Sequence, residues 1–362
     1  MNVQLKHPAL GVLATLVVVA SALLISVSMA PLTMIAWVTL LLVAMVPAQI
    51  VLSLALQGQH PAFLAKLPQP WRGASFCVLT ALVGLPIAAV ANATVGGGVT
   101  PPTPFVNMFL ILAVTVTLGL VVPFQCWPFS AIFPKRPMLI GVSILVAAYG
   151  IAALLFKTLF NFDFLSGAPF YRADLNPHGL FMGWIPLIFA LTCFAVILCL
   201  VLLDFWPVAT LPPLVSAIGR QPWFGIVSAI LITLVATGVW SIFVGKFQMD
   251  MVVYLVRVVI SLVFGIFILL IMMEGAPFIS IPQPGRGVVL ILIAIGLSIV
   301  SFAIYKFACQ DVFGLPSGPP SYDRELWLAS AMLAVTFPMM VAYANFFQFW
   351  PFRTTAGQGN TE

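Results

Sequence analysis

Ten long runs of apolar residues, separated by short polar or proline-rich connections, make up most of the 362-residue chain. A helix crosses the hydrocarbon core of a bilayer with about 20 residues. Lys6 precedes the first run as in a signal peptide, but the run is too long for one, and we expect a retained helix. The pattern predicts an all-α polytopic membrane protein with a single transmembrane domain over 1–362. Its spans are expected at about 9–29, 32–56, 74–94, 105–124, 138–157, 183–205, 224–244, 250–273, 287–307 and 327–349.

A proline turn follows every second apolar run. Four of the turns lead on to a second proline and an arginine, as in Pro70-Trp71-Arg72 and Pro284-Gly285-Arg286. This spacing predicts five repeated two-helix hairpins, which duplication of one hairpin would produce. The interface preferences of tryptophan, proline and arginine would produce much of the same signature without duplication, and two inverted halves of five spans also fit the number. The turns begin at Gln59-His60-Pro61, Cys126-Trp127-Pro128, Phe205-Trp206-Pro207, Gly275-Ala276-Pro277 and Phe349-Trp350-Pro351.

Composition supports the membrane prediction. The chain is 62% hydrophobic and 6% charged, whereas a soluble domain has about 25% charged residues. The basic residues stand singly, so the net charge of +5 does not indicate a nucleic-acid partner. The expected partners are membrane lipids, a small polar or anionic substrate, and other copies or subunits within the membrane.

The charged residues of the connections predict the orientation. Basic residues in excess mark the cytoplasmic side, so both termini are expected in the cytoplasm of a bacterial cell. The predicted inner connections and termini carry Lys6, Lys66, Arg72, Lys135, Arg136, Arg220, Arg286 and Arg353. The predicted outer side carries Lys157, Arg172, Lys246, Lys306 and Arg324.

Two long outer connections, about 158–182 and 308–326, hold the candidate ligand-binding residues. They share the order Ser-Gly-x-Pro-x-Tyr-x-x-acid-Leu, from Ser166 to Leu175 and from Ser317 to Leu326. The functional interpretation is a polar vestibule or lid over a cavity, in which arginines hold an anionic group. The structural interpretation is that each arginine pairs with a neighbouring acid where a helix begins at a wet interface. The candidate residues are Tyr171, Arg172, Asp174, His178, Tyr322, Asp323, Arg324 and Glu325.

Arg257 is the one charged residue well inside a predicted span, and it completes the predicted ligand-binding set. Ionisable groups at such depth are costly and therefore suggest function. Its candidate partners are Asp250 and Lys246 on the same helix entry, or an acid from another loop. Extension of the arginine to the outer interface is the structural alternative.

Other polar residues are expected to be structural. Asp204 and Glu274 lie just before proline turns, and we expect both to accept hydrogen bonds from the N–H groups of the turn that follows. The residues at roughly corresponding positions in the other hairpins are Gln59, Gln125 and Gln348. Asn107, Asn345 and Gln348 are expected to hydrogen-bond between helices.

The sequence lacks the motifs of several chemistries. His7, His60 and His178 are far apart, and no cluster of histidine and cysteine has metal-ligand spacing, so we expect no metal and no cofactor. A P-loop, a nucleophile elbow and a relay of intramembrane acids are also missing, and no catalytic residue is predicted. None of the five cysteines forms a CxxC pair, and no structural disulfide is expected.

The predicted function is a small-molecule permease with a cavity under the two long outer loops. Repeat-built bundles without cofactor ligands favour a carrier. A carrier predicts a polar cavity that reaches the bilayer midplane, faced by Arg257 or by helices broken at Gly84-Leu85-Pro86 or Pro338. The alternative is a non-catalytic membrane subunit that anchors a larger complex, with a solid core. A third hypothesis is a membrane enzyme acting on a lipid or quinone at the outer interface, with Asp174 and His178 in hydrogen-bond reach.

Overall fold

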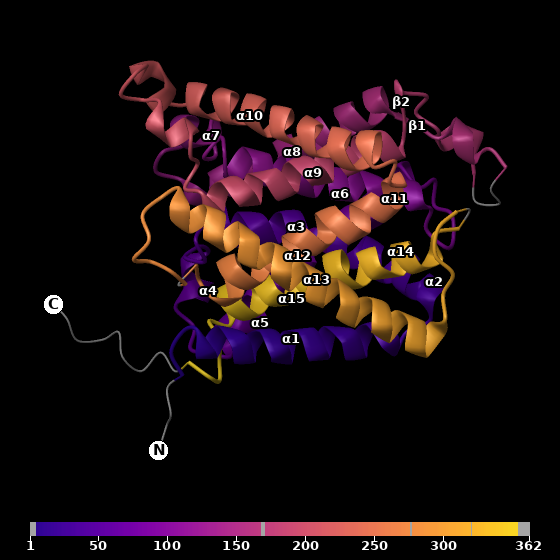
Figure 1. Ribbon diagram of the computed structural model, residues 1–362, viewed down its shortest axis with the longest axis horizontal. Coiled ribbons are helices and arrows are strands. Elements are labelled where there is room, and N and C mark those ends of the chain that lie inside the picture. The colour runs from indigo at the N-terminus through magenta and orange to yellow at the C-terminus, as the bar shows by residue number, and fades with distance from the viewer. Residues whose placement is uncertain (1–4, 168–170, 276, 320, 354–362) are drawn as a thin grey trace.

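The computed structural model describes residues 5–167, 171–275, 277–319 and 321–353. This part of the chain contains ten helices that are long and apolar enough to cross a membrane, as the sequence predicts. They lie roughly parallel in one bundle (Figure 1). The largest difference from the expected bounds is in the ninth span, which continues to Phe313.

The ten spans form two layers. In the second, fourth, sixth, eighth and tenth spans, between 56% and 67% of the most apolar stretch is buried. The share is between 17% and 33% in the first, third, fifth, seventh and ninth spans. Even-numbered spans are therefore the inner spans, and odd-numbered spans are the outer spans.

The inner spans contact one another in chain order, and the tenth returns to the second, so they form a closed ring. Three of them alternate between α-helical and π-helical turns, whereas α6 and α9 are regular. The second comprises α2 (Pro31–Thr33), η1 (Met34–Val38), α3 (Thr39–Ile50) and η2 (Val51–Ala55); the fourth is α6 (Pro104–Val121) and the sixth α9 (Trp184–Leu202). The eighth comprises α11 (Met251–Tyr254), η8 (Leu255–Ile260), α12 (Ser261–Phe267) and η9 (Ile268–Met272). The tenth comprises α14 (Asp323–Ala329), η10 (Ser330–Thr336), α15 (Phe337–Val341) and η11 (Ala342–Phe346).

Each outer span packs against at least two inner spans. Its buried residues recur every three or four positions and are mostly small, as in Gly225, Ser228, Ile232 and Ala236. Small side chains let helix backbones approach closely where lipid supplies no hydrophobic drive for association. The outer spans are α1 (Ala9–Val27), α5 (Trp71–Thr94), α8 (Pro137–Leu159), α10 (Trp223–Trp240) continued by the π-helical η7 (Ser241–Lys246), and α13 (Gly285–Phe313).

The two ends of the bundle differ. The end that holds Leu5 and Arg353 is called here the terminal end, and it carries the proline turns (Figure 1). The opposite end, the loop end, carries the connections 158–182 and 308–326. Short elements within the connections are α4 (Ala62–Ala65), α7 (Phe129–Ile132), the paired parallel strands β1 (Phe160–Asn161) and β2 (Phe181–Met182), and the 3₁₀ turns η3 (Asp163–Leu165), η4 (Ala173–Leu175), η5 (Val208–Thr210) and η6 (Ser216–Gly219).

A recurring glutamine joins outer spans to the inner ring at the terminal end. Gln283 Nε2 donates to the Leu202 carbonyl at 3.0 Å, and Gln283 Oε1 accepts from the Gly287 N–H at 3.0 Å. Gln69 and Gln221 make the same pair of bonds at the starts of α5 and α10. Their inner acceptors are the carbonyls of Phe346 and Pro123, and their N–H donors are Gly73 and Gly225. We call this arrangement the glutamine clamp.

Two arginines of the signature, Arg72 and Arg286, hold the proline turns that precede them. Arg72 Nη2 donates to the Gly58 carbonyl at 2.9 Å, and Arg286 donates to the Gly275 carbonyl. Each therefore bridges the end of one inner span to the start of the next outer span. This contact gives the arginines a structural role in addition to their interface preference.

The polar residues before the turns bind differently from the expectation. All five inner spans end in two residues with positive φ, and the first of each pair is polar: Gln57, Gln125, Asp204, Glu274 and Gln348. The residue corresponding to Asp204 is therefore Gln57, not Gln59. Asp204 accepts from Gln283 Nε2 at 2.9 Å, and Glu274 accepts from Arg353 at 2.8 Å. These partners come from other segments and not from the N–H groups of the turn that follows.

Two further expectations concern the interior. Asn107 Nδ2 donates to the Ile35 carbonyl at 3.1 Å, which confirms its bond between the fourth and second spans. All five cysteines are free.

At the loop end the interior is filled by aromatic rings, including Phe105 stacked on Phe162 with centroids 4.0 Å apart.

Candidate functional site

The first long loop is folded around its own polar residues. Arg172 binds Asp174 through two hydrogen bonds of 3.0 and 2.9 Å, and this contact holds the pKa of Asp174 below its ordinary value. Asn176 donates to Asp163 at 2.7 Å, and His178 Nδ1 lies 3.5 Å from Asp163. Both pairs of charged residues are largely exposed.

Tyr171 joins the same cluster, since its hydroxyl donates to Asp163 at 3.4 Å. Asp174 and His178, which the enzyme hypothesis requires to meet, are engaged with different partners in the described residues. Phe160 and Phe162 anchor the loop because both rings are fully buried. Ala168–Phe170, part of the shared loop motif, lie outside the described residues.

The second long loop is also internally bonded. Glu325 is buried and accepts from the Ser317 hydroxyl and from the Gly318 N–H, and Arg324 lies 3.6 Å from it. Asp323 accepts from Ser321 at 2.8 Å. Each arginine thus has a neighbouring acid as its partner, as the structural interpretation expects. Pro320, also part of the motif, lies outside the described residues.

Tyr322 connects this loop to the eighth span. Its hydroxyl donates to Asp250 Oδ2 at 2.7 Å, while Asp250 Oδ1 accepts from the N–H groups of Val252 and Val253 and so caps α11. Asp250 is therefore not the partner of Arg257. The Arg257 side chain is exposed in η8, and no hydrogen bond or ion pair is recorded for it within the described chain.

The Tyr322 contact predicts a pH dependence. Burial first, and then the hydrogen bond to Asp250, raises the pKa of Tyr322 to about 12. Because the folded pKa exceeds the ordinary value, the contact stabilises the fold fully below about pH 10 and is lost as pH rises towards 12. We expect a difference titration of phenolate absorbance, wild type minus Tyr322→Phe, to show a midpoint near 12.

Asp250→Asn is the matched control for this titration, because asparagine still caps the helix. It should lower the midpoint only partly, since burial remains. A wild-type midpoint near 10 would contradict the contact.

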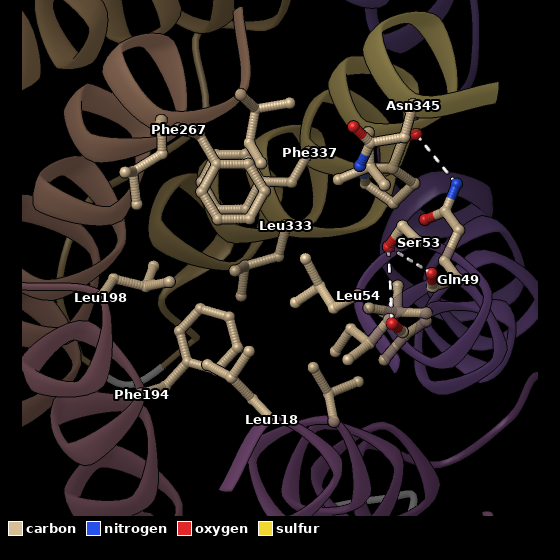
Figure 2. A pocket seen from close by; sticks show the side chains of 18 of the residues that line it. Gln49, Ser53, Leu54, Leu118, Phe194, Leu198, Phe267, Leu333, Phe337 and Asn345 are labelled. Atoms are coloured by element: carbon tan, nitrogen blue, oxygen red, sulfur yellow. Dashed lines mark hydrogen bonds between the residues drawn. The ribbon is translucent and has the colours of Figure 1, made fainter. Parts of the chain in front are cut away.

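A cavity of about 100 Å³ lies on the axis of the inner ring (Figure 2). All five inner spans contribute lining residues, and most are aliphatic or aromatic, including Leu118, Leu198, Phe194, Phe267 and Phe337. The lining residues fall in the middle and the terminal-end half of each span. The cavity is therefore far from the two long loops, and none of the nine predicted ligand-binding residues lines it.

Polar groups gather on one side of this cavity. Gln49, Ser53 and Asn345 are its polar lining residues, and no charged side chain lines it among the residues that the structure describes. Gln49 Nε2 donates to the Pro338 backbone carbonyl at 3.0 Å, and Ser53 Oγ donates to the backbone carbonyl of Gln49 at 2.6 Å. The arrangement suits an uncharged molecule that is mostly apolar, because a bare charge buried here would have no partner.

Wide helical turns surround the same cavity. Ser53 lies in η2, Ile271 in η9 and Asn345 in η11, so three inner spans end in π-helical turns beside it. Pro338 also lines the cavity, whereas α5 continues regularly through Pro86. Isolated π-turns occur frequently at functional sites. The carrier hypothesis expects breaks at Gly84-Leu85-Pro86 or Pro338, whereas both α5 and α15 continue through these prolines and the π-helical turns lie at other positions.

Gln49 does not belong to the ligand-binding set predicted from the sequence. It is a polar residue inside the second apolar run, two positions after Pro47. Uncharged amides in membrane helices also mark polar contacts, so this signal was present. The π-helical turns and the closed ring leave no comparable mark in the sequence.

Comparisons with protein-family models, curated proteins and solved structures give no match.

Proposed function

We propose that the protein is a permease for small, uncharged molecules with an apolar body, and that the axial cavity is its binding site. The observation that carries the proposal is the contribution of all five inner spans to one cavity, with Gln49, Ser53 and Asn345 on a single side. A membrane subunit without transport activity would be expected to fill this space.

The lining determines the substrate class. The loop arginines suggested an anionic substrate. Because no charged group lines the cavity in the described chain, we propose an uncharged substrate instead. A polar group that crosses the hydrocarbon core without a hydrogen-bond partner costs roughly 4–8 kcal/mol. The amides of Gln49 and Asn345 lower this cost for a molecule carrying one polar group.

The wide turns provide a basis for movement. The π-helical ends of the second, eighth and tenth spans can change their hydrogen-bond register locally while the regular α6 and α9 stay in place. Transporters commonly place their sites at discontinuous helices for this reason. In a transport cycle, the aromatic rings that fill the loop end would close the path between the cavity and that face.

The proposal places the terminal end in the cytoplasm of a bacterial cell, following the distribution of basic residues. It also treats the five hairpins as copies of one unit. The glutamine clamp in three outer spans, together with the left-handed pair of residues at the end of every inner span, supports duplication. Interface preferences alone do not require these internal bonds.

Flux through proteoliposomes tests the proposal. Stopped-flow light scattering with glycerol, 1,2-propanediol and 1,2-hexanediol should show faster entry into vesicles that contain the protein than into empty vesicles. Val114→Trp fills the cavity from α6 and should lower the protein-dependent rate at least about tenfold, because the substrate loses its space.

Leu292→Trp is the matched control, because Leu292 lies on the outer face of α13 with 63% of its surface exposed. This variant should keep the wild-type rate. Both variants must elute as folded protein before rates are compared. Equal rates in empty vesicles, wild type and Val114→Trp would overturn the permease.

A further inference from the structure

The Gln49 amide has one buried atom without a partner. Only 6% of the residue is exposed, and its Nε2 donates to the Pro338 carbonyl at 3.0 Å. Its Oε1 is buried and has no hydrogen-bond partner. Buried polar atoms are nearly always paired, so an unpaired acceptor beside a cavity indicates a missing donor.

The orientation of this amide follows from its neighbour. The Pro338 carbonyl can only accept, so the Gln49 atom that faces it must be the nitrogen. A flipped amide would place two oxygens against each other. The oxygen therefore turns to the cavity side, away from the bond to Pro338 (Figure 2).

The adjacent polar groups define the complementary ligand. Ser53 already donates its proton to the backbone carbonyl of Gln49, so it offers only an acceptor to the cavity. The Asn345 side chain also lines the cavity, and no hydrogen bond from its amide is recorded among the described residues. A group that donates to Gln49 Oε1 and accepts from Asn345 Nδ2 satisfies both amides. A neutral hydroxyl has this combination.

We infer that the cavity binds an uncharged alcohol whose hydroxyl donates to Gln49 Oε1 and whose apolar body lies among Leu118, Leu198 and Phe267. The inference rests on the proposed function, since it names the substrate class of the same cavity. A carboxylate or an ammonium group is excluded because no charged side chain faces it. The volume of about 100 Å³ limits the enclosed body to a short chain, as a cavity of about 150 Å³ holds benzene.

Photolabelling with a matched pair of probes tests the inference. The first probe is a short alkanol that carries a diazirine on its chain, and the second is its methyl ether, which lacks the donor. Each is irradiated with the wild-type protein in lipid nanodiscs, and the labelled residues are mapped by mass spectrometry. The alkanol should label residues around the cavity, and the ether should label them about tenfold less.

Gln49→Met removes the acceptor at nearly constant side-chain volume. It should lower labelling by the alkanol about tenfold and leave labelling by the ether unchanged. Gln57→Met is the control, because Gln57 is an exposed glutamine just beyond the end of the same span. Val114→Trp is a second variant that blocks the cavity without touching Gln49, and it should abolish labelling of the cavity by both probes.

The outcomes separate the two proposals. Equal labelling of the cavity by the alkanol and the ether would overturn the hydroxyl assignment. Undiminished labelling of Gln49→Met by the alkanol would also overturn it. Water would then be the partner of Gln49. Label restricted to lipid-facing residues would overturn binding in this cavity. The permease itself fails only if the protein-dependent flux is absent, which is a separate measurement.

Discussion

Replacing Gly265 with alanine is expected to lower the free energy of unfolding by about 2 kcal/mol or more, because it forces two packed helices apart. Gly265 lies where α12 packs against α13. A Cβ atom there would overlap the carbonyl oxygen of Ala294 and would lie 2.8 Å from its carbonyl carbon. Backbone atoms cannot rotate away as a side chain can, so the helices must separate.

Gly296→Ala is the matched control. Gly296 lies on α13, two residues from Ala294, and nothing lies within 4 Å of the Cβ that alanine would add. Alanine also has the higher helix propensity, by up to about 1 kcal/mol. This variant should therefore be neutral or slightly stabilised. Unfolding by sodium dodecyl sulfate in mixed micelles measures both, and equal shifts in the two variants would contradict the role of the close contact.

Gln283→Met is expected to have the second-largest effect, a loss of about 2–3 kcal/mol in the free energy of unfolding. Gln283 makes three hydrogen bonds, with the Leu202 carbonyl, the Asp204 carboxylate and the Gly287 N–H. Each contributes about 0.5–1.5 kcal/mol net, and the partners left behind are incompletely satisfied. The same unfolding assay measures the loss.

The other clamps provide a graded series. Gln69 and Gln221 each make two of these bonds and have no acid partner in the described chain, so Gln69→Met and Gln221→Met should cost less than Gln283→Met. Gln310→Met is the control, because Gln310 is exposed near the other end of α13. An effect of Gln283→Met no larger than that of Gln310→Met would show that the clamp does not hold the outer spans.

The candidate site was only partly accessible from sequence. Because they are charged, Arg172, Arg324 and Arg257 were predicted to bind a ligand. In the structure the two loop arginines have local acid partners, and Arg257 is exposed. Among the described residues that line the cavity, the one with a buried polar atom that lacks a hydrogen bond is Gln49, whose amide carries no charge. Its significance depends on Pro338, which is 289 residues away in the chain, and no local pattern connects the two.

The sequence by itself determined the ten spans, their proline turns and the presence of polar residues before those turns. It did so because the hydrocarbon core requires a minimum length of apolar helix, and because proline and left-handed residues act within a few positions of the chain. The tertiary structure alone decided which spans are inner. Lipid and protein interior are equally apolar, so hydropathy does not show which face of a span turns towards its neighbours. Ring closure, the axial cavity and the free oxygen of Gln49 all depend on that rotation.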